Sequence, residues 1–410
     1  MIKRILYTLL IMFPVVASAQ INTDRVMAIG RNALYFEDYV LSIQYFNQVI
    51  NAKPYLSDPY FYRGLAKINL DDFQGAESDC SEAIERNPFV VSAYQVRGLA
   101  RIQQNNFAGA IEDYTKALEF DPENIGVWHN MALCRIRQED YKGAKNDLDK
   151  LIAISPRYTK AYLMRGEVDL KQKDTLAAEK DFGKAIEIDR YDADTWASRA
   201  ILRLQQQRYK DAEADFDHAI RLSTRNSGVY INRALARYHQ NNLRGAMSDY
   251  DIALDIDPNN FIGHYNRGLL RAQVGDDNRA IQDFNFVIEM EPDNMMAIFN
   301  RGLLLDQTGD YKGAIKDYST VINEYPNFLL GYQYRAQARR KIGDVKGADA
   351  DEFKVLKAQL DKQNGVDPNK QTADNTENNK TRKKSDKNMN NYRKIVIADD
   401  SEADQRYTSD

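Results

Sequence analysis

The chain has 410 residues, of which 43% are hydrophobic and 28% charged, and its formal net charge is -4. That apolar content is sufficient for a large folded body. The near-neutral balance gives no sign of nucleic-acid binding, because proteins that bind nucleic acid cluster an excess of Lys and Arg against the phosphates.

The first 19 residues have the pattern of a secretory signal peptide. Two basic residues, Lys3 and Arg4, precede an apolar run of thirteen residues, and the small residues Ala17-Ser18-Ala19 close the segment. A membrane span needs about 20 apolar residues, so the short run favours a cleaved signal over an N-terminal anchor. We therefore expect cleavage before Gln20 and a periplasmic or secreted mature protein without a membrane span.

A period of 34 residues begins after this segment. If Thr23 is counted as slot 1, slot 8 of every 34-residue unit holds glycine or alanine, and slot 24 is bulky in most units. Prolines recur at the same interval, at Pro54, Pro88, Pro122, Pro156, Pro258, Pro292 and Pro326. A fixed period of this length is typical of repeat architectures.

Each unit is predicted to be a hairpin of two helices. Apolar residues recur at helical spacing in slots 4, 8, 9 and 12 and again in slots 20, 24, 27 and 28. Between the two stretches lie turn signals such as Gly275-Asp276, in which glycine ends one helix and aspartate caps the next. In such a hairpin, slot 8 faces slot 24, so a missing side chain on one helix makes room for a ring on the other.

This pattern resembles the tetratricopeptide repeat, with ten units over residues 23–362 that start at 23, 57, 91, 125, 159, 193, 227, 261, 295 and 329. The resemblance implies an all-α solenoid, a right-handed superhelix of ten helix–turn–helix hairpins. It also implies a concave groove, lined by the first helices, that binds peptides or other proteins.

Slot 7 departs from the usual repeat, because it holds arginine in eight of the ten units where leucine is typical. Slot 23 holds aspartate in nine units, and in a hairpin the two slots lie nearly level. We expect these residues to form ion pairs, within the hairpin or to the adjacent unit. A row of arginines that binds an anionic ligand is the less favoured alternative, since each arginine already has a carboxylate beside it.

The sequence contains no recognisable catalytic or metal site. The four histidines, His129, His218, His239 and His264, occupy scattered slots without metal-ligand spacing. Cys80 and Cys134 lie two units apart, too far for a disulfide, and are expected to be buried free thiols. We therefore predict a protein that is not an enzyme and has no cofactor.

The expected binding site lies on the first helices of the rear repeats, where slots 2, 5, 6 and 9 form one stripe. From unit 7 onward its exposed part becomes apolar and asparagine-rich. An asparagine amide suits the backbone of an extended peptide, and apolar neighbours suit alternate side chains. The predicted site residues are Ile231, Asn232, Ile262, Tyr265, Asn266, Met296, Phe299, Asn300 and Leu330. The alternative interpretation is that these residues only pack neighbouring first helices.

The period stops after Lys362. Residues 363–391 are rich in asparagine and lack aromatic residues, leucine and isoleucine, which predicts a disordered linker. The apolar run Tyr392-Arg393-Lys394-Ile395-Val396-Ile397 then begins a tail over residues 392–410. This tail is interpreted as a loose end, a short docking strand or the start of a further domain.

Together these features predict a non-catalytic scaffold of the cell envelope or secreted space that binds an extended protein segment in the groove of its rear repeats. The alternative is a regulatory or targeting module for an enzymatic or carbohydrate-active domain beyond Asp410. The absence of lysine and arginine from slot 2 of the rear units favours an internal or apolar segment as the ligand.

Overall fold

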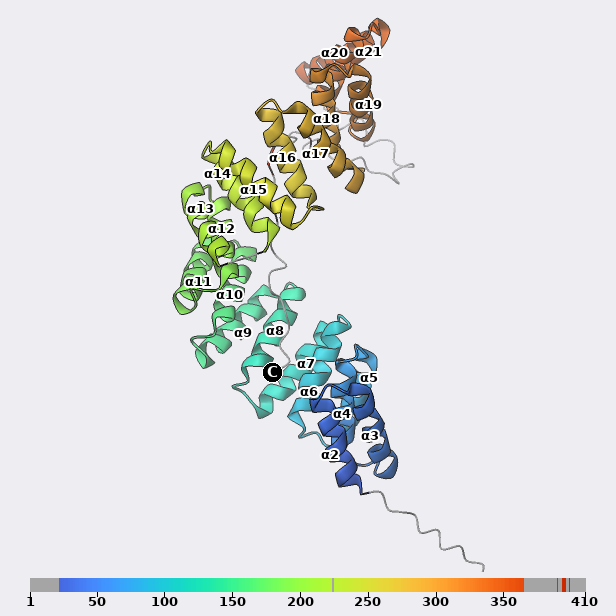
Figure 1. Cartoon of the computed structure of the whole chain (residues 1–410), viewed down its shortest axis with the longest axis vertical. Helices are drawn as coiled ribbons and strands as arrows, with labels where there is room; N and C mark the ends of the chain where they lie inside the picture. Colours follow the sequence, from blue (N-terminus) through green and yellow to red (C-terminus); the bar gives the residue numbers. More distant parts are fainter. Residues whose placement is uncertain (1–21, 223–224, 365–388, 390–392, 396–397, 399–410) are drawn as a thin grey trace, which may run out of the picture. The chain divides into compact units, whose positions relative to one another are not determined.

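The structure is a computed structural model that describes residues 22–222, 225–364, 389, 393–395 and 398. The expected signal peptide at 1–19 lies outside the described residues, as does most of the expected linker and tail. The described part forms helices that pair in chain order (Figure 1). It divides into two compact units, each made of several 34-residue repeats. The all-α solenoid predicted from the period is confirmed within each unit.

The first unit ends at Ile188 and holds five helix pairs. In each pair the first helix contacts the second, and the second contacts the first helix of the next pair. The pairs are α2 (Thr23–Tyr35) with α3 (Tyr39–Ala52), α4 (Asp58–Ile68) with α5 (Phe73–Arg86), α6 (Val91–Gln103) with α7 (Phe107–Phe120), α8 (Ile125–Arg137) with α9 (Tyr141–Ile154), and α10 (Thr159–Lys171) with α11 (Thr175–Ile188).

The second unit begins at Asp189 and repeats this arrangement. Its last helix continues one residue past the expected end of the repeats, to Gln363. The pairs are α12 (Ala193–Gln205) with α13 (Tyr209–Arg221), α14 (Ser227–His239) with α15 (Leu243–Ile256), α16 (Phe261–Gln273) with α17 (Asp277–Met290), α18 (Met295–Thr308) with α19 (Tyr311–Glu324), and α20 (Leu329–Lys341) with α21 (Val345–Gln363).

The turn inside each hairpin depends on a left-handed residue at slot 15. Three of these residues are the glycines expected from the sequence, Gly275, Gly309 and Gly343. In the other units the same slot has positive φ without glycine, as at Lys173 (φ 64°) and Glu139 (φ 59°). The sequence predicts this conformation only where glycine is present, because a side chain there carries a steric cost that the fold tolerates.

The residue after the turn usually caps the second helix. Asp72 Oδ1, for example, accepts a hydrogen bond from the Gly75 amide at 2.9 Å, and Asp310 Oδ1 accepts one from Gly313 at 3.0 Å. Asp276 differs, since its side chain makes no capping hydrogen bond. The expected cap is therefore wrong for this turn and correct for most of the others.

The two helices of a hairpin pack through the expected pairing of slot 8 with slot 24. A Cβ atom added at Gly166 would lie 2.5 Å from Cε1 of Phe182, and one at Gly98 would lie 2.8 Å from Cε1 of Tyr114. Both rings are almost completely buried. The glycine is therefore selected by the close approach of the facing ring, as the sequence predicts.

The ion pairs between slots 7 and 23 are also confirmed. Each slot-7 guanidinium donates hydrogen bonds to the aspartate of its own hairpin, and these aspartates are buried. The pairs are Arg63–Asp79, Arg97–Asp113, Arg165–Asp181, Arg199–Asp215, Arg233–Asp249, Arg267–Asp283, Arg301–Asp317 and Arg335–Asp351.

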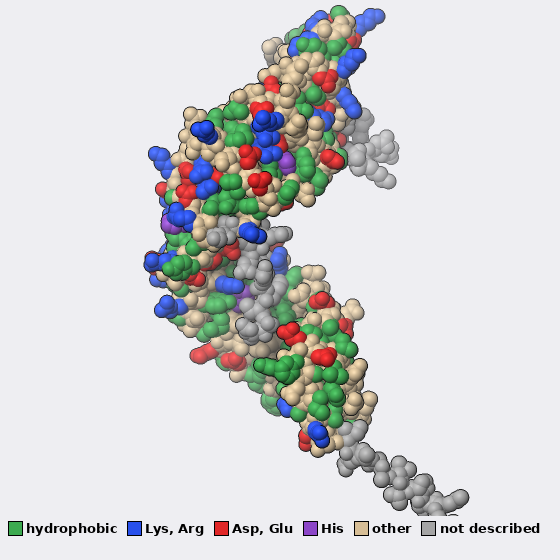
Figure 2. All heavy atoms as spheres, in the orientation of Figure 1, with side chains coloured by type: hydrophobic (Ala, Val, Ile, Leu, Met, Phe, Trp, Pro, Cys, Tyr) green, Lys and Arg blue, Asp and Glu red, His purple; other side chains and the backbone are tan. Residues whose placement is uncertain are grey.

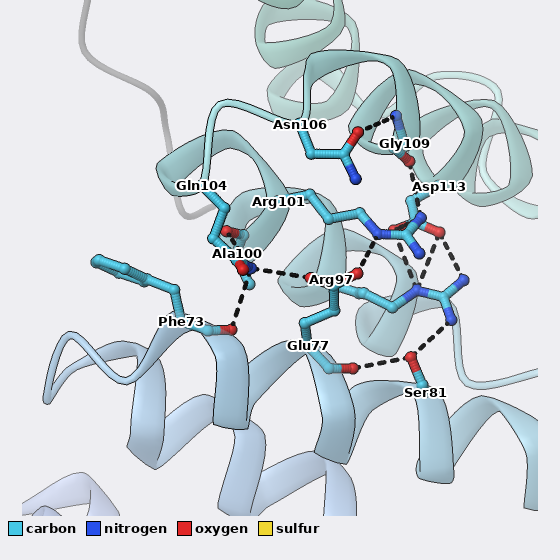
Figure 3. Close-up of polar contacts among 10 residues, drawn as sticks. All are labelled: Phe73, Glu77, Ser81, Arg97, Ala100, Arg101, Gln104, Asn106, Gly109 and Asp113. Atoms are coloured by element: carbon cyan, nitrogen blue, oxygen red, sulfur yellow. Dashed lines mark hydrogen bonds and ion pairs between the residues drawn. The ribbon is translucent and has the colours of Figure 1, made fainter.

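Many of these arginines form a second bond, to the second helix of the preceding hairpin, which we call the inter-repeat tie. Figure 3 shows one of them: Arg97, on α6, donates to Asp113 of α7 and through Nη1 to Ser81 Oγ of α5 at 3.1 Å. The other inter-repeat ties are Arg63–Asn47, Arg165–Asp149, Arg233–Asp217, Arg267–Asp251, Arg301–Asn285 and Arg335–Ser319. One side chain therefore fixes the register of three helices.

Unit 4 lacks this arginine, because Met131 occupies the slot. The buried carboxylate of Asp147 is instead bonded by Arg135 Nε at 2.7 Å. Burial raises the pKa of Asp147 to about 6, although the nearby Arg135 guanidinium lowers it. A buried carboxylate with a single arginine partner is thus held only weakly in its ionised form.

Terminal repeats of a solenoid need a polar outer face to stay soluble, but α21 also exposes apolar side chains. Phe353, Leu356 and Leu360 are exposed there among the lysines. Among the described residues no helix is long and apolar enough to cross a membrane.

Candidate peptide-binding site

The nine predicted site residues lie on the first helices of the second unit. Ile231 and Asn232 are on α14, Ile262, Tyr265 and Asn266 on α16, Met296, Phe299 and Asn300 on α18, and Leu330 on α20. On the face seen in Figure 2, acidic and basic side chains are interspersed, without a large area of one sign. The distinctive chemistry of the candidate site is therefore its buried asparagines and apolar side chains.

The slot-5 side chains are buried, whereas the sequence predicts an exposed stripe. Phe299 is fully buried and packs edge-to-face on Phe328, with ring centroids 5.0 Å apart. Tyr265 is 4% exposed and packs edge-to-face on Phe284. Phe299 also packs on Tyr334 of α20, and Tyr265 shares an apolar cluster with residues of α18. Both residues therefore fit the alternative interpretation that they pack neighbouring first helices.

The three asparagines of slot 6 are all buried, but their surroundings differ. Asn300 Nδ2 donates to the carbonyl oxygen of Met296, one turn earlier on its own helix, at 2.9 Å, and to Tyr265 Oη at 3.4 Å. Asn266 is completely buried. Asn232 is also completely buried, and its partner comes from a distant part of the chain.

Asn232 binds the backbone of Ala398 through both ends of its amide. The Ala398 amide donates to Asn232 Oδ1 at 2.9 Å, and Asn232 Nδ2 donates to the Ala398 carbonyl oxygen at 2.9 Å. A strand residue presents its N–H and C=O on the same side in this way when it exchanges both bonds with one partner. The Asn232 amide therefore binds the backbone of Ala398 and not a side chain.

Apolar side chains accompany this pair of hydrogen bonds. Ala398 is 4% exposed and belongs to the same apolar cluster as Ile231 and the partly buried Ile262. Ile395 is buried in a cluster with Leu235. Met389 is 1% exposed and shares a cluster with Phe299, and the partly buried Met296 and Leu330 pack against that cluster.

The histidines and cysteines form no reactive group in the described part of the chain. His218 stacks on Trp196, His239 stacks on Tyr209, and His264 Nδ1 lies 2.9 Å from Asp283 Oδ1. There, no three His, Cys, Asp or Glu side chains are placed to share a metal ion. Cys80 and Cys134 are buried free thiols as predicted, and burial raises the pKa of each to about 12.

One feature of the candidate site is not predicted from the sequence. The apolar run after Tyr392 suggests docking, but nothing in the period indicates Asn232 as its partner.

The fold and the site define a helical-repeat protein of the kind that acts as a protein-interaction scaffold. Tetratricopeptide repeat family models match residues 125–158, 159–192, 198–261 and 265–327, and a further TPR repeat model matches residues 98–134. The chain belongs to the tetratricopeptide repeat family.

Solved structures of the same fold are similar to this chain at low identity. A tetratricopeptide repeat protein from Parabacteroides merdae is 21% identical, with a TM-score of 0.48, over 61% of this chain and 98% of that one. The C-terminal part of a TPR repeat-containing protein from Cytophaga hutchinsonii is 18% identical, with a TM-score of 0.47, over 57% and 96%. MamA from Desulfovibrio magneticus is 16% identical, with a TM-score of 0.40, over 42% and 96%. Comparison with proteins of curated function gave no match.

Proposed function

We propose that this protein is a non-catalytic scaffold of the cell envelope or secreted space that binds an extended protein segment on α14, α16 and α18, which are the first helices of their hairpins. The observation that carries the proposal is the pair of hydrogen bonds between the Asn232 amide and one backbone residue. Because the Asn232 amide contacts only the backbone of the segment, segments of varied sequence can bind if their side chains fit the apolar surroundings.

The location rests on the first 19 residues, whose basic start, apolar run and small-residue end are typical of exported proteins. Fusion of residues 1–25 to a reporter that is active only after export tests this part. Reporter activity is expected, and it should disappear when Leu9 and Leu10 are replaced by aspartate. An inactive wild-type fusion would overturn the location.

The binding site is tested by placing a photo-crosslinking amino acid at Ile262 of the full chain in cells and identifying the crosslinked segments by mass spectrometry. In the Asn232→Ala variant we expect capture to fall about fivefold or more, because loss of a buried hydrogen-bonding group costs about 1–3 kcal/mol. Asn130→Ala is the matched control, since Asn130 occupies the same slot on α8, outside the proposed binding helices, and is buried like Asn232. If capture is unchanged in Asn232→Ala while the helical content is intact, Asn232 does not hold the ligand.

A further inference from the structure

The backbone held by Asn232 belongs to this same chain, 166 residues further on. We propose that the segment containing Met389, Ile395 and Ala398 is a built-in occupant of the candidate site, which an external segment has to displace. This inference rests on the proposed function, because it treats the segment as standing in the place of the ligand.

The contacts are those of a docked segment and not of a loose end. Ala398 and Ile395 are 4% and 8% exposed, whereas their neighbours Arg393 and Lys394 are exposed. Two apolar residues of the tail are thus buried against the helices. A single unspecific apolar contact would not bury both of them and also form two hydrogen bonds between Asn232 and one backbone residue.

The docked residues indicate the chemistry of an external ligand. The residue held by Asn232 is alanine, and it is almost completely enclosed in the cluster around Ile231 and Tyr250. A larger side chain in that place would overpack a dense interior. Three residues earlier, a branched apolar side chain is buried beside Leu235. We therefore expect a ligand with a small residue at the Asn232 contact, an isoleucine-like residue three positions before it, and no free terminus at this point.

Covalent attachment makes the built-in segment a strong competitor. A tethered segment acts at an effective concentration on the order of a millimolar, so it occupies the site even when its intrinsic affinity is modest. An external segment then binds with an apparent affinity reduced by the fraction of molecules whose site is open. Release of the tail should raise the apparent affinity for added peptide by at least about tenfold.

The test uses the full chain and a fluorescein-labelled peptide with the sequence of residues 386–402, followed by fluorescence anisotropy. The releasing variants are Ile395→Asp, which puts a charge in a buried place, and Ala398→Pro, which removes the amide that donates to Asn232. The matched control is Lys394→Asp, which makes the same replacement at the exposed neighbouring position.

We expect both releasing variants to bind the peptide at least about tenfold more tightly than the wild type and the Lys394→Asp control. Adding Asn232→Ala to Ile395→Asp should abolish this gain. Equal affinity in all variants, or wild-type affinity that increases when the protein is diluted, would overturn the proposal. The second result would mean that the segment docks onto another copy of the chain.

Hydrogen exchange supplies a second measurement that does not depend on a variant that folds. The Ala398 amide of the wild type should exchange at least about a hundredfold more slowly than in the free peptide, because it is buried and hydrogen-bonded. Exchange at the free-peptide rate would refute the docking. If the amide is protected and the releasing variants bind the peptide, but crosslinking in cells does not depend on Asn232, the docking stands and the proposed function fails.

Discussion

Replacement of Gly166 by alanine tests the packing that sets the repeat. An added Cβ would lie 2.5 Å from Cε1 of Phe182, whereas ordinary contacts are 3.4–4 Å, so the ring would have to move by about 1 Å. Phe182 is fully buried, in an interior that packs at crystal density. Overpacking of this kind costs about 1–3 kcal/mol, while alanine in place of glycine stabilises a helix by about 1 kcal/mol.

We therefore expect Gly166→Ala to lower the stability of its hairpin by up to about 2 kcal/mol. The matched control is Gly268→Ala, which adds the same atom opposite the same ring type, at 3.2 Å from Phe284. There the helix-propensity gain offsets the milder crowding, and the change should stay within about 1 kcal/mol of zero. Hydrogen exchange of α10 and α11, compared with α16 and α17, measures the two hairpins separately.

A double variant makes the prediction sharper. Gly166→Ala with Phe182→Leu reproduces Ala132 and Leu148, the pair that unit 4 already uses in these slots. The two changes should therefore be coupled by at least about 1 kcal/mol, with the double variant more stable than the sum of the single ones. Equal effects of Gly166→Ala and Gly268→Ala on hairpin stability, or strict additivity in the double variant, would refute this account of the close helix spacing that recurs in the repeats.

Three further predictions follow from the described residues. The raised pKa of Asp147 means that the folded state binds a proton there more readily than the unfolded state does. Its contribution to the free energy of unfolding is therefore present below about pH 4 and lost as pH rises through about 6, and the two-unit shift corresponds to about 3 kcal/mol. Asp147→Asn should remove this part of the pH dependence, measured by urea unfolding at pH 4 and 7. Cys80 and Cys134, whose pKa values are raised to about 12 by burial, should resist iodoacetamide at pH 8 until the protein is unfolded, and rapid labelling of the native protein, detected by mass spectrometry, would contradict their burial. Lys173→Gly should stabilise the α10–α11 hairpin by about 1 kcal/mol, because Lys173 has φ 64°, which costs a side chain energy but suits glycine. Gln172→Gly, at φ -85°, is the control and should destabilise the hairpin by a similar amount. Thermal unfolding distinguishes the two variants, and equal shifts of the unfolding temperature would refute the role of the turn.

The sequence predicts those parts of the fold that repeat with the period. Gly166 and Phe182 are recognisable as partners because a small residue and a bulky one recur in these two slots in most units, and the same holds for the charges of Arg97 and Asp113. The left-handed turn is predicted at Gly275 but not at Lys173, because only glycine indicates positive φ from the residue type alone. A backbone conformation that recurs in every hairpin, but with different residue types, cannot be predicted from the sequence pattern.

The candidate site is only partly predictable for a related reason. Asn232 is recognised from its slot, but its hydrogen-bond partner is Ala398, which lies outside the period and far away in the chain. Phe299 is placed on an exposed stripe by its slot, yet Phe328 at the N-cap of α20 and Tyr334 on α20 pack against it. Contacts of this kind depend on what the neighbouring element brings, and one stripe of slots does not contain that information.

The inter-repeat ties also determine how the first unit responds to mechanical tension. Where an arginine bonds to the helix before it, separating two hairpins breaks a hydrogen bond of a partly buried guanidinium, while the buried aspartate of its own hairpin keeps its partner. Between α7 and α8 this tie does not form, because Met131 replaces the arginine and the Thr115 hydroxyl donates to Ile111 of its own helix. Among the hairpins of residues 22–188, force applied along the chain would therefore separate α7 from α8 first. The repeat that contains Met131 would thus be the point at which this part of the solenoid stretches most easily.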